Sequence, residues 1–243
     1  MKNINYAAID KVIDLIIPYV SNNSDLYLYV PNGDYSYAEV PAARDICNIL
    51  SDNHISASCH NGLSKLVITS PTFGDAVIKL PIYSLYDDCY DSDTVYDIPY
   101  SKAAAADPSD YCMAELEKYN TVKKIGLEFF LAETVLYKTI NDTPIYLQEY
   151  IEVDSEVYAE HEPTKGSLSK AKELNSSYRK ILPDSAMEWI GCCIDFYGED
   201  AVEDFLDYCD TKDKDILDDF HCNNYGYRLN GEPCILDYSN YNE

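Results

Sequence analysis

Three oxygen-bearing side chains lie close together near the end of the sequence. Asp219 precedes Asn224 by five residues, and Asp237 follows Asn224 by thirteen residues, within an apolar run. Phosphoryl transfer from ATP needs a carboxylate that orients or deprotonates the acceptor hydroxyl, and it needs oxygen ligands that hold Mg²⁺ against the phosphates. These side chains could supply both parts, so this stretch is the candidate site of chemistry.

The spacing D-x-x-x-x-N is that of the protein-kinase catalytic loop. The stretch "DFHCNN" resembles the D-L-H-x-x-N of aminoglycoside phosphotransferases and of small kinase-like bacteriophage proteins, and "ILDY" is similar to their metal-binding I-D-[FWY]. The resemblance implies that Asp219 is the catalytic base and that Asn224 and Asp237 are metal ligands. It also implies that His221 shapes the loop.

Two upstream motifs extend the resemblance. "AVIK", which ends at Lys79, resembles the V-A-I-K of kinases, in which the lysine reaches the nucleotide phosphates. "NGLSKLVI" resembles the shortened glycine loop of the phage proteins, and it would place Gly62 and the amides of Leu63 and Ser64 over the phosphates. The structural alternatives are an ordinary lysine at a strand end and an Asn-Gly hairpin.

A kinase also needs a helix with a glutamate that pairs with the lysine. "MAELEKYNTV" offers Glu115 and Glu117, which cannot both face inward. We favour Glu115 because Tyr119, on one plausible packed side, lies one helical turn after it. The alternative is that both glutamates are solvated charges on the helix surface.

The hinge between the two lobes would lie in "IYLQEYIE". By resemblance, the backbone of Glu149, Tyr150 and Ile151 would hydrogen-bond adenine. The resemblance then covers about residues 54–238 in the order loop, lysine, glutamate helix, hinge, helices, Asp/Asn loop and final aspartate. It implies ATP and Mg²⁺ as cofactors.

The sequence also departs from the kinase pattern. Leu217 stands two residues before Asp219, where kinases have the histidine of H-R-D, and Asp237-Tyr238-Ser239 replaces D-F-G. Six residues follow Asp237, so an activation segment and the later helices of an acceptor platform are not expected there. The acceptor site would have to come from the N-terminal helices, from residues 83–100 or from a second protein.

The patterns of the first half predict helices followed by a small sheet. An apolar stripe predicts a first helix that ends near Pro18, and residues 40–50 predict a second. Residues 54–80 predict three antiparallel strands separated by turn formers. The stripe comprises Ile9, Val12, Ile13, Ile16 and Ile17.

After these strands, a helix is predicted between residues 107 and 126, with Asp107 or Ser109 as its N-cap and Gly126 as its stop. Two further strands are predicted around the turn Asn141-Asp142. Residues 83–100 have no clear period and are expected to form an irregular or exposed insertion.

The second half predicts mainly helix, over residues 167–182, 184–198 and 199–210. The expected fold class is α+β: a bilobal kinase-like fold with an antiparallel-sheet N-lobe plus one helix and a reduced helical C-lobe, preceded by N-terminal helices. The expected domains are an N-terminal helical extension over 1–52, an N-lobe over 53–152 and a truncated C-lobe with the catalytic loop over 153–243.

The composition limits the class of partner. With 43 acidic and 18 basic residues, the net charge of −25 argues against direct binding of nucleic acid, which requires neutralisation of phosphates. No apolar run approaches the roughly 18 residues of a membrane span, and no export signal is recognisable, so a cytoplasmic protein is expected. If the chain is phage-encoded, this would be the host cytoplasm. The nine cysteines and four scattered histidines predict reduced thiols and no zinc site.

Two functions from different classes fit these features. The first is an ATP-dependent phosphotransferase that transfers phosphate to a hydroxyl of a protein or small molecule. The alternative is a catalytically weak or inactive pseudokinase that acts as an acidic, DNA-mimic-like interaction protein and binds a basic host protein. The retained motifs favour the first function, and the acidity and the missing C-terminal segment favour the second.

Overall fold

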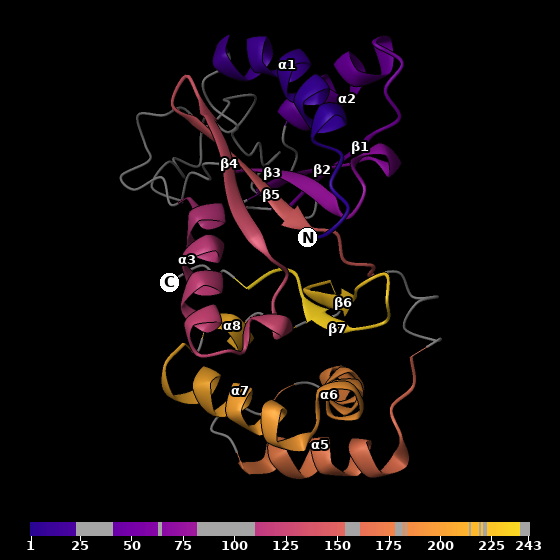
Figure 1. The fold of residues 1–243 in the computed structure, drawn as a ribbon, viewed down its shortest axis with the longest axis vertical. Helices are drawn as coiled ribbons and strands as arrows, with labels where there is room; N and C mark the ends of the chain where they lie inside the picture. Colours follow the sequence, from indigo (N-terminus) through magenta and orange to yellow (C-terminus); the bar gives the residue numbers. More distant parts are fainter. Residues whose placement is uncertain are drawn as a thin grey trace, which may run out of the picture. The chain divides into compact units, whose positions relative to one another are not determined.

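In the computed structural model, the described part of the chain divides into two compact units (Figure 1). Unit 1 comprises Met1–Ala114 and Thr134–Gln148, and unit 2 comprises Glu115–Glu133 and Glu149–Glu243. The structure describes residues 1–22, 41–62, 65–81, 110–153, 161–177, 182, 184–213, 215–218, 220 and 223–238. The expected insertion over residues 83–100 lies outside them.

Two helices open unit 1. Helix α1 (Tyr6–Asn22) buries the predicted stripe at Ile9, Val12, Ile13 and Ile16, and α2 (Pro41–Asp52) confirms the second predicted helix.

The prediction that the first helix ends near Pro18 is wrong, because α1 continues through that residue. Proline in a helix removes one backbone hydrogen bond. The turn that follows buries Val20, which continues the apolar stripe by one more turn and offsets that loss.

The strands of unit 1 form an antiparallel sheet. Five strands in the described part of the chain have the order β1-β2-β3-β5-β4 (Figure 1). The first two hairpins confirm the predicted meander, which includes a short 3-10 turn, η3, at Pro71–Phe73. The strands are β1 (Ser58–Asn61), β2 (Lys65–Thr69), β3 (Ala76–Pro81), β4 (Thr134–Ile140) and β5 (Thr143–Glu149).

One face of this sheet packs against the two N-terminal helices. Leu66, Ile68, Ile78 and Leu80 share one hydrophobic cluster with the buried residues of α1 and α2. Because neighbouring side chains on a strand point to opposite faces, Lys79 lies on the other face, opposite Val67 of β2. The predicted N-terminal extension is therefore packed on the sheet within unit 1, as the cover of one face.

The turn between β4 and β5 confirms its sequence prediction. Asn141 and Asp142 have φ angles of 48° and 63°, which matches the two-residue hairpin turn that fits the twist of paired strands.

Helix α3 (Tyr111–Lys124) forms within the predicted range, and the residue that caps its N-terminus is Asp110. The expected caps, Asp107 and Ser109, lie outside the described residues. The carboxylate of Asp110 accepts a hydrogen bond from the Met113 amide at 2.9 Å and another from the Tyr146 hydroxyl at 2.6 Å. Gly126, with a φ of 79°, lies just beyond the helix and confirms the predicted stop.

Unit 2 is mainly helical, as predicted. Its hydrophobic core contains Met187 and Ile190 of the helix predicted over residues 184–198, together with residues of a short hairpin (Figure 1). The hairpin β6–β7 was not predicted. The elements are η5 (Glu128–Phe130), α5 (Lys165–Ser177), α6 (Asp184–Tyr197), α7 (Glu199–Thr211), α8 (Asp215–Asp218), β6 (Tyr225–Tyr227) and β7 (Pro233–Ile235).

The fold class is therefore α+β, with an antiparallel sheet and helices. Among the described residues, no helix combines the length and the apolarity that a membrane span requires.

We predict that Asp110→Ala lowers the free energy of unfolding by about 1–2 kcal/mol, because it removes the cap of α3 and the acceptor for Tyr146. Urea denaturation measures this change. Asp110→Asn is the matched control, since asparagine caps helices about as well as aspartate, and it should retain most of the stability. Equal losses for the two variants would contradict the capping role.

A second prediction concerns pH. Asp195 of α6 accepts hydrogen bonds from the hydroxyl of Ser167 and from the amide and hydroxyl of Thr164, at the start of α5. Burial raises the pKa of Asp195, but these hydrogen bonds outweigh it and hold the pKa below its ordinary value of 3.8. The stabilisation is therefore present above that value and is lost as the pH falls through the lower pKa of the folded state.

Accordingly, Asp195→Asn should destabilise the chain at neutral pH, and its difference from the wild type should narrow at acidic pH. Urea unfolding at a series of pH values measures this difference. A difference that stays constant from about pH 7 to about pH 3 would show that the carboxylate charge has no role at this contact.

Candidate functional site

The two predicted metal ligands are neighbours in unit 2. Asn224 directly precedes β6, and its backbone carbonyl accepts hydrogen bonds from the amides of Leu236 at 2.9 Å and Asp237 at 3.3 Å. These bonds hold Asn224 beside Asp237, although thirteen residues separate them in sequence. The structure thus brings the backbones of an asparagine and an aspartate together, and the side chains of these residue types carry the oxygen donors that Mg²⁺ prefers.

This pair is a sparse donor set. Within the described ranges, no group of three or more His, Cys, Asp or Glu side chains is arranged to hold a metal ion. Mg²⁺ is commonly bound by one or two protein oxygens together with substrate phosphates and water. The pair therefore fits a magnesium ion that arrives with a nucleotide better than it fits a resident structural metal.

Backbone pairing fixes the hairpin that carries these ligands. The amide of Glu152 donates to the carbonyl of Tyr227 at 2.8 Å, and the amide of Tyr227 donates to the carbonyl of Glu152 at 3.0 Å. On the other strand, the amide of Ala132 donates to the carbonyl of Ile235 at 2.7 Å. Chain segments on both sides therefore hold β6 and β7 in place.

Gly226 permits the first of these contacts. A β-carbon at Gly226 would overlap the backbone carbonyl of Glu152 and would also approach Ile151. Only glycine lets the segment around Glu152 lie this close to β6.

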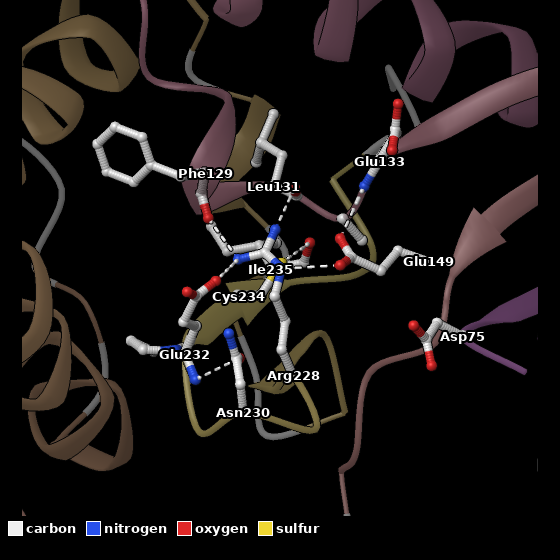
Figure 2. Close-up of polar contacts among 12 residues, drawn as sticks. Asp75, Phe129, Leu131, Glu133, Glu149, Arg228, Asn230, Glu232, Cys234 and Ile235 are labelled. Carbon is white, nitrogen blue, oxygen red and sulfur yellow. Dashed lines mark hydrogen bonds and ion pairs between the residues drawn. The ribbon is translucent and has the colours of Figure 1, made fainter. Parts of the chain in front are cut away.

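A buried arginine joins the same segments. The guanidinium of Arg228, 13% exposed, pairs with the Glu149 carboxylate at 3.0 Å and donates to the carbonyls of Phe129 at 2.8 Å and Leu131 at 3.1 Å (Figure 2). It also donates to the Tyr197 hydroxyl at 3.3 Å. All three nitrogens of the guanidinium therefore donate hydrogen bonds.

The groups around Arg228 favour the charged form of its guanidinium. Burial lowers the pKa of Arg228, but the surrounding groups, including Glu149, outweigh it and hold the pKa above its ordinary value. Glu232 adds a second carboxylate at 3.6 Å. The guanidinium is therefore a permanent cation that fixes the carboxylate of Glu149.

The predicted hinge segment, residues 149–151, is held at both ends. The amide of Glu149 donates to the carbonyl of Glu133 at 2.9 Å, and Glu152 pairs with Tyr227. Between them, the backbone N–H and C=O of Ile151 make no hydrogen bond to another described residue. Ile151 therefore has the backbone donor and acceptor that a planar base edge could use.

The predicted phosphate-binding residues belong to unit 1. Lys79 of β3 is only 3% exposed, so it is not an ordinary solvated lysine at a strand end. Gly62 is exposed, its amide donates to the carbonyl of Lys65 at 3.0 Å, and the space around its α-carbon is open. Leu63 and Ser64 lie outside the described residues.

The remaining predicted residues have separate outcomes. Glu115 is completely buried and Glu117 is exposed, so the inward glutamate is the one that the sequence favoured. A buried carboxylate needs polar partners, which excludes the alternative of two solvated charges. Asp219 and His221 fall outside the described residues, and their roles stay predictions.

Sequence reasoning missed Arg228 and Gly226. A signal was present in "YGYRLNGEPCIL", where apolar residues alternate before the turn former Asn230-Gly231 and a short apolar run follows it, which is typical of a hairpin. A lone arginine in such an alternation is a candidate for a buried, paired charge.

Comparison with models of known protein families finds no match, and a search of curated proteins finds no significant match.

We predict that Gly226→Ala lowers the free energy of unfolding by about 1–3 kcal/mol, because backbone atoms on both sides must move to admit the methyl group. Chemical denaturation measures the loss. Gly166→Ala in α5 is the control: its nearest neighbour would lie at 3.9 Å, so the change should be neutral or slightly stabilising. Similar losses at both positions would contradict the close approach at Gly226.

Proposed function

We propose that the protein is an ATP-dependent phosphotransferase that transfers phosphate to a hydroxyl of a protein or small molecule. The observation that carries this proposal is the adjacency of Asn224 and Asp237, which two backbone hydrogen bonds to one carbonyl produce. These are the two residues to which the kinase-like resemblance assigns magnesium. Neighbouring oxygen donors at these positions are what that assignment requires.

Further support comes from the other retained positions. Lys79 and Glu115 are both buried charged residues, which is the state expected of a lysine for nucleotide phosphates and the glutamate that orients it. The chain order of three strands, a helix and two strands is also the order that the resemblance implies for the small lobe, although Glu115–Glu133 belong to unit 2.

The proposed roles follow from the chemistry of each group. Asp219 would orient the acceptor hydroxyl and receive its proton, and Lys79 would bind the phosphates. Asn224 and Asp237 would hold Mg²⁺, which when bound neutralises the charge that develops on the transferred phosphoryl group. The backbone of residues 149–151 would bind adenine and thereby orient the triphosphate.

The charge of the chain restricts the acceptor. With a net charge of −25, the protein repels anionic acceptors and attracts cationic ones. We therefore propose that the acceptor is an amine-bearing small molecule or a basic protein.

The decisive test combines binding and transfer. The wild type should show a higher melting temperature with Mg²⁺ and ATP, because a ligand that binds only the folded state stabilises it. Asp219→Asn should keep this shift and lose phosphate transfer by about a hundredfold or more, as expected for removal of a general base. Transfer of the labelled phosphate of ATP is measured with a panel of basic proteins and amino alcohols as acceptors.

Two further variants sharpen the test. Asp237→Asn should lose the magnesium-dependent part of the thermal shift. Asp142→Asn, in the exposed β4–β5 turn, should change neither binding nor transfer, because asparagine also adopts positive φ. Undiminished transfer by Asp219→Asn would remove the catalytic assignment, and a wild type without any thermal shift would overturn the proposal as a whole.

A second candidate is an interaction protein on the same scaffold, binding a basic protein without turnover. The observation that favours it is a run of exposed carboxylates on α7, at Glu199, Asp200, Glu203, Asp204 and Asp207. Nucleotide-independent, salt-sensitive binding to a basic protein, together with no thermal shift from Mg²⁺-ATP, would favour this candidate.

A further inference from the structure

We propose that Arg228 is a positioning residue that fixes the nucleobase-binding segment, residues 149–151, relative to the metal-binding pair. This inference rests on the proposed function, because it concerns how the same nucleotide site is kept in shape. Arg228 itself would touch neither nucleotide nor metal. It would act through the carboxylate of Glu149.

The geometry on the hairpin carries the inference. Tyr227 and Arg228 are consecutive: Tyr227 pairs by backbone with Glu152, and Arg228 pairs by side chain with Glu149. The two ends of the segment are thus attached to neighbouring residues of one hairpin. Ile151, whose backbone groups make no bond to another described residue, lies between these attachments.

The other contacts of the guanidinium explain why Glu149 does not move freely. Arg228 donates to the carbonyls of Phe129 and Leu131, which flank the end of η5 (Figure 2). It also donates to the hydroxyl of Tyr197 on α6. The guanidinium is therefore anchored independently of Glu149. Glu149 is held by a group that is itself fixed.

The metal-binding pair has a different attachment. Asn224 and Asp237 are joined by backbone bonds to the Asn224 carbonyl, and Arg228 takes no part in those bonds. Loss of Arg228 contacts should therefore loosen the 149 end of the segment and leave the metal pair in place. This separation makes the inference testable.

Lysine at this position is the informative substitution. An ammonium keeps the positive charge, but it lacks the planar fork that bonds Glu149 and the two carbonyls at the same time. Arg228→Lys therefore removes positioning and retains charge. Glu149→Gln changes the same contact from the other side, with little change in side-chain shape.

The experiment measures the affinity of the full chain for two probes, Mg²⁺-ATP and magnesium tripolyphosphate, by isothermal titration calorimetry. ATP uses both the base segment and the metal pair, whereas tripolyphosphate has no base. Arg228→Lys should weaken ATP binding by about tenfold, the size expected for a hydrogen bond to a charged group, and leave tripolyphosphate within about twofold. Glu149→Gln should also weaken ATP binding and leave tripolyphosphate binding unchanged, but its loss of ATP affinity should be smaller than that of Arg228→Lys.

Amide hydrogen exchange gives a second readout that needs no ligand. The Glu149 amide, which donates to Glu133, should exchange about tenfold faster in Arg228→Lys. The amides of Leu236 and Asp237, which donate to Asn224, should keep their wild-type rates. A general loss of stability would accelerate all three amides together.

Arg44→Lys is the matched control, because the Arg44 side chain is 71% exposed and its ion pair is with the neighbouring Asp45. It should alter neither affinity nor exchange. Equal losses of affinity for both probes, or an unchanged exchange rate of the Glu149 amide, would overturn the inference. The proposed function would still stand if the wild type binds ATP. A wild type that binds neither probe would overturn both. If Arg228→Lys does not fold, Glu149→Gln decides by the same measurements.

Discussion

The buried guanidinium of Arg228 is the interaction that fixes Glu149 and residues 129–131 against the β6–β7 hairpin. Removing a charged group from water is costly unless each of its donors finds an acceptor. Each nitrogen of the Arg228 guanidinium has an acceptor, provided by the carboxylate of Glu149, two carbonyls from residues 129–131 and the hydroxyl of Tyr197. Any arrangement that separates one of these groups leaves a buried donor unsatisfied, so the network specifies one packing of distant segments.

A second constraint acts through the backbone. Gly226 lets Glu152 pair with Tyr227, and the carbonyl of Asn224 binds the amides that follow β7. The chain thus positions the backbones of Asn224 and Asp237 by main-chain bonds. The hairpin geometry thereby sets the distance between the two backbones, and the side-chain rotamers decide where the oxygen atoms lie.

Local patterns predicted much of the fold. The stripe of α1, the two strands around Asn141-Asp142 and the stop at Gly126 all follow from forces between residues close in sequence. The end near Pro18 was wrong because burial of Val20 offsets a local penalty that sequence rules treat as decisive. The β6–β7 hairpin was not predicted, because its strands are short and are stabilised by Glu152 and Ala132, which lie far away in the chain.

The candidate site likewise has features that the sequence determines and features that only the tertiary structure determines. The sequence by itself determined which oxygen donors and charges are present, at Lys79, Asn224 and Asp237, and it favoured Glu115 over Glu117 through helical spacing. Only the tertiary structure decided that Asn224 and Asp237 are neighbours and that Arg228 binds Glu149. The physical reason is range: helix and turn preferences act over a few residues, whereas pairing and burial of polar groups depend on segments that folding brings together.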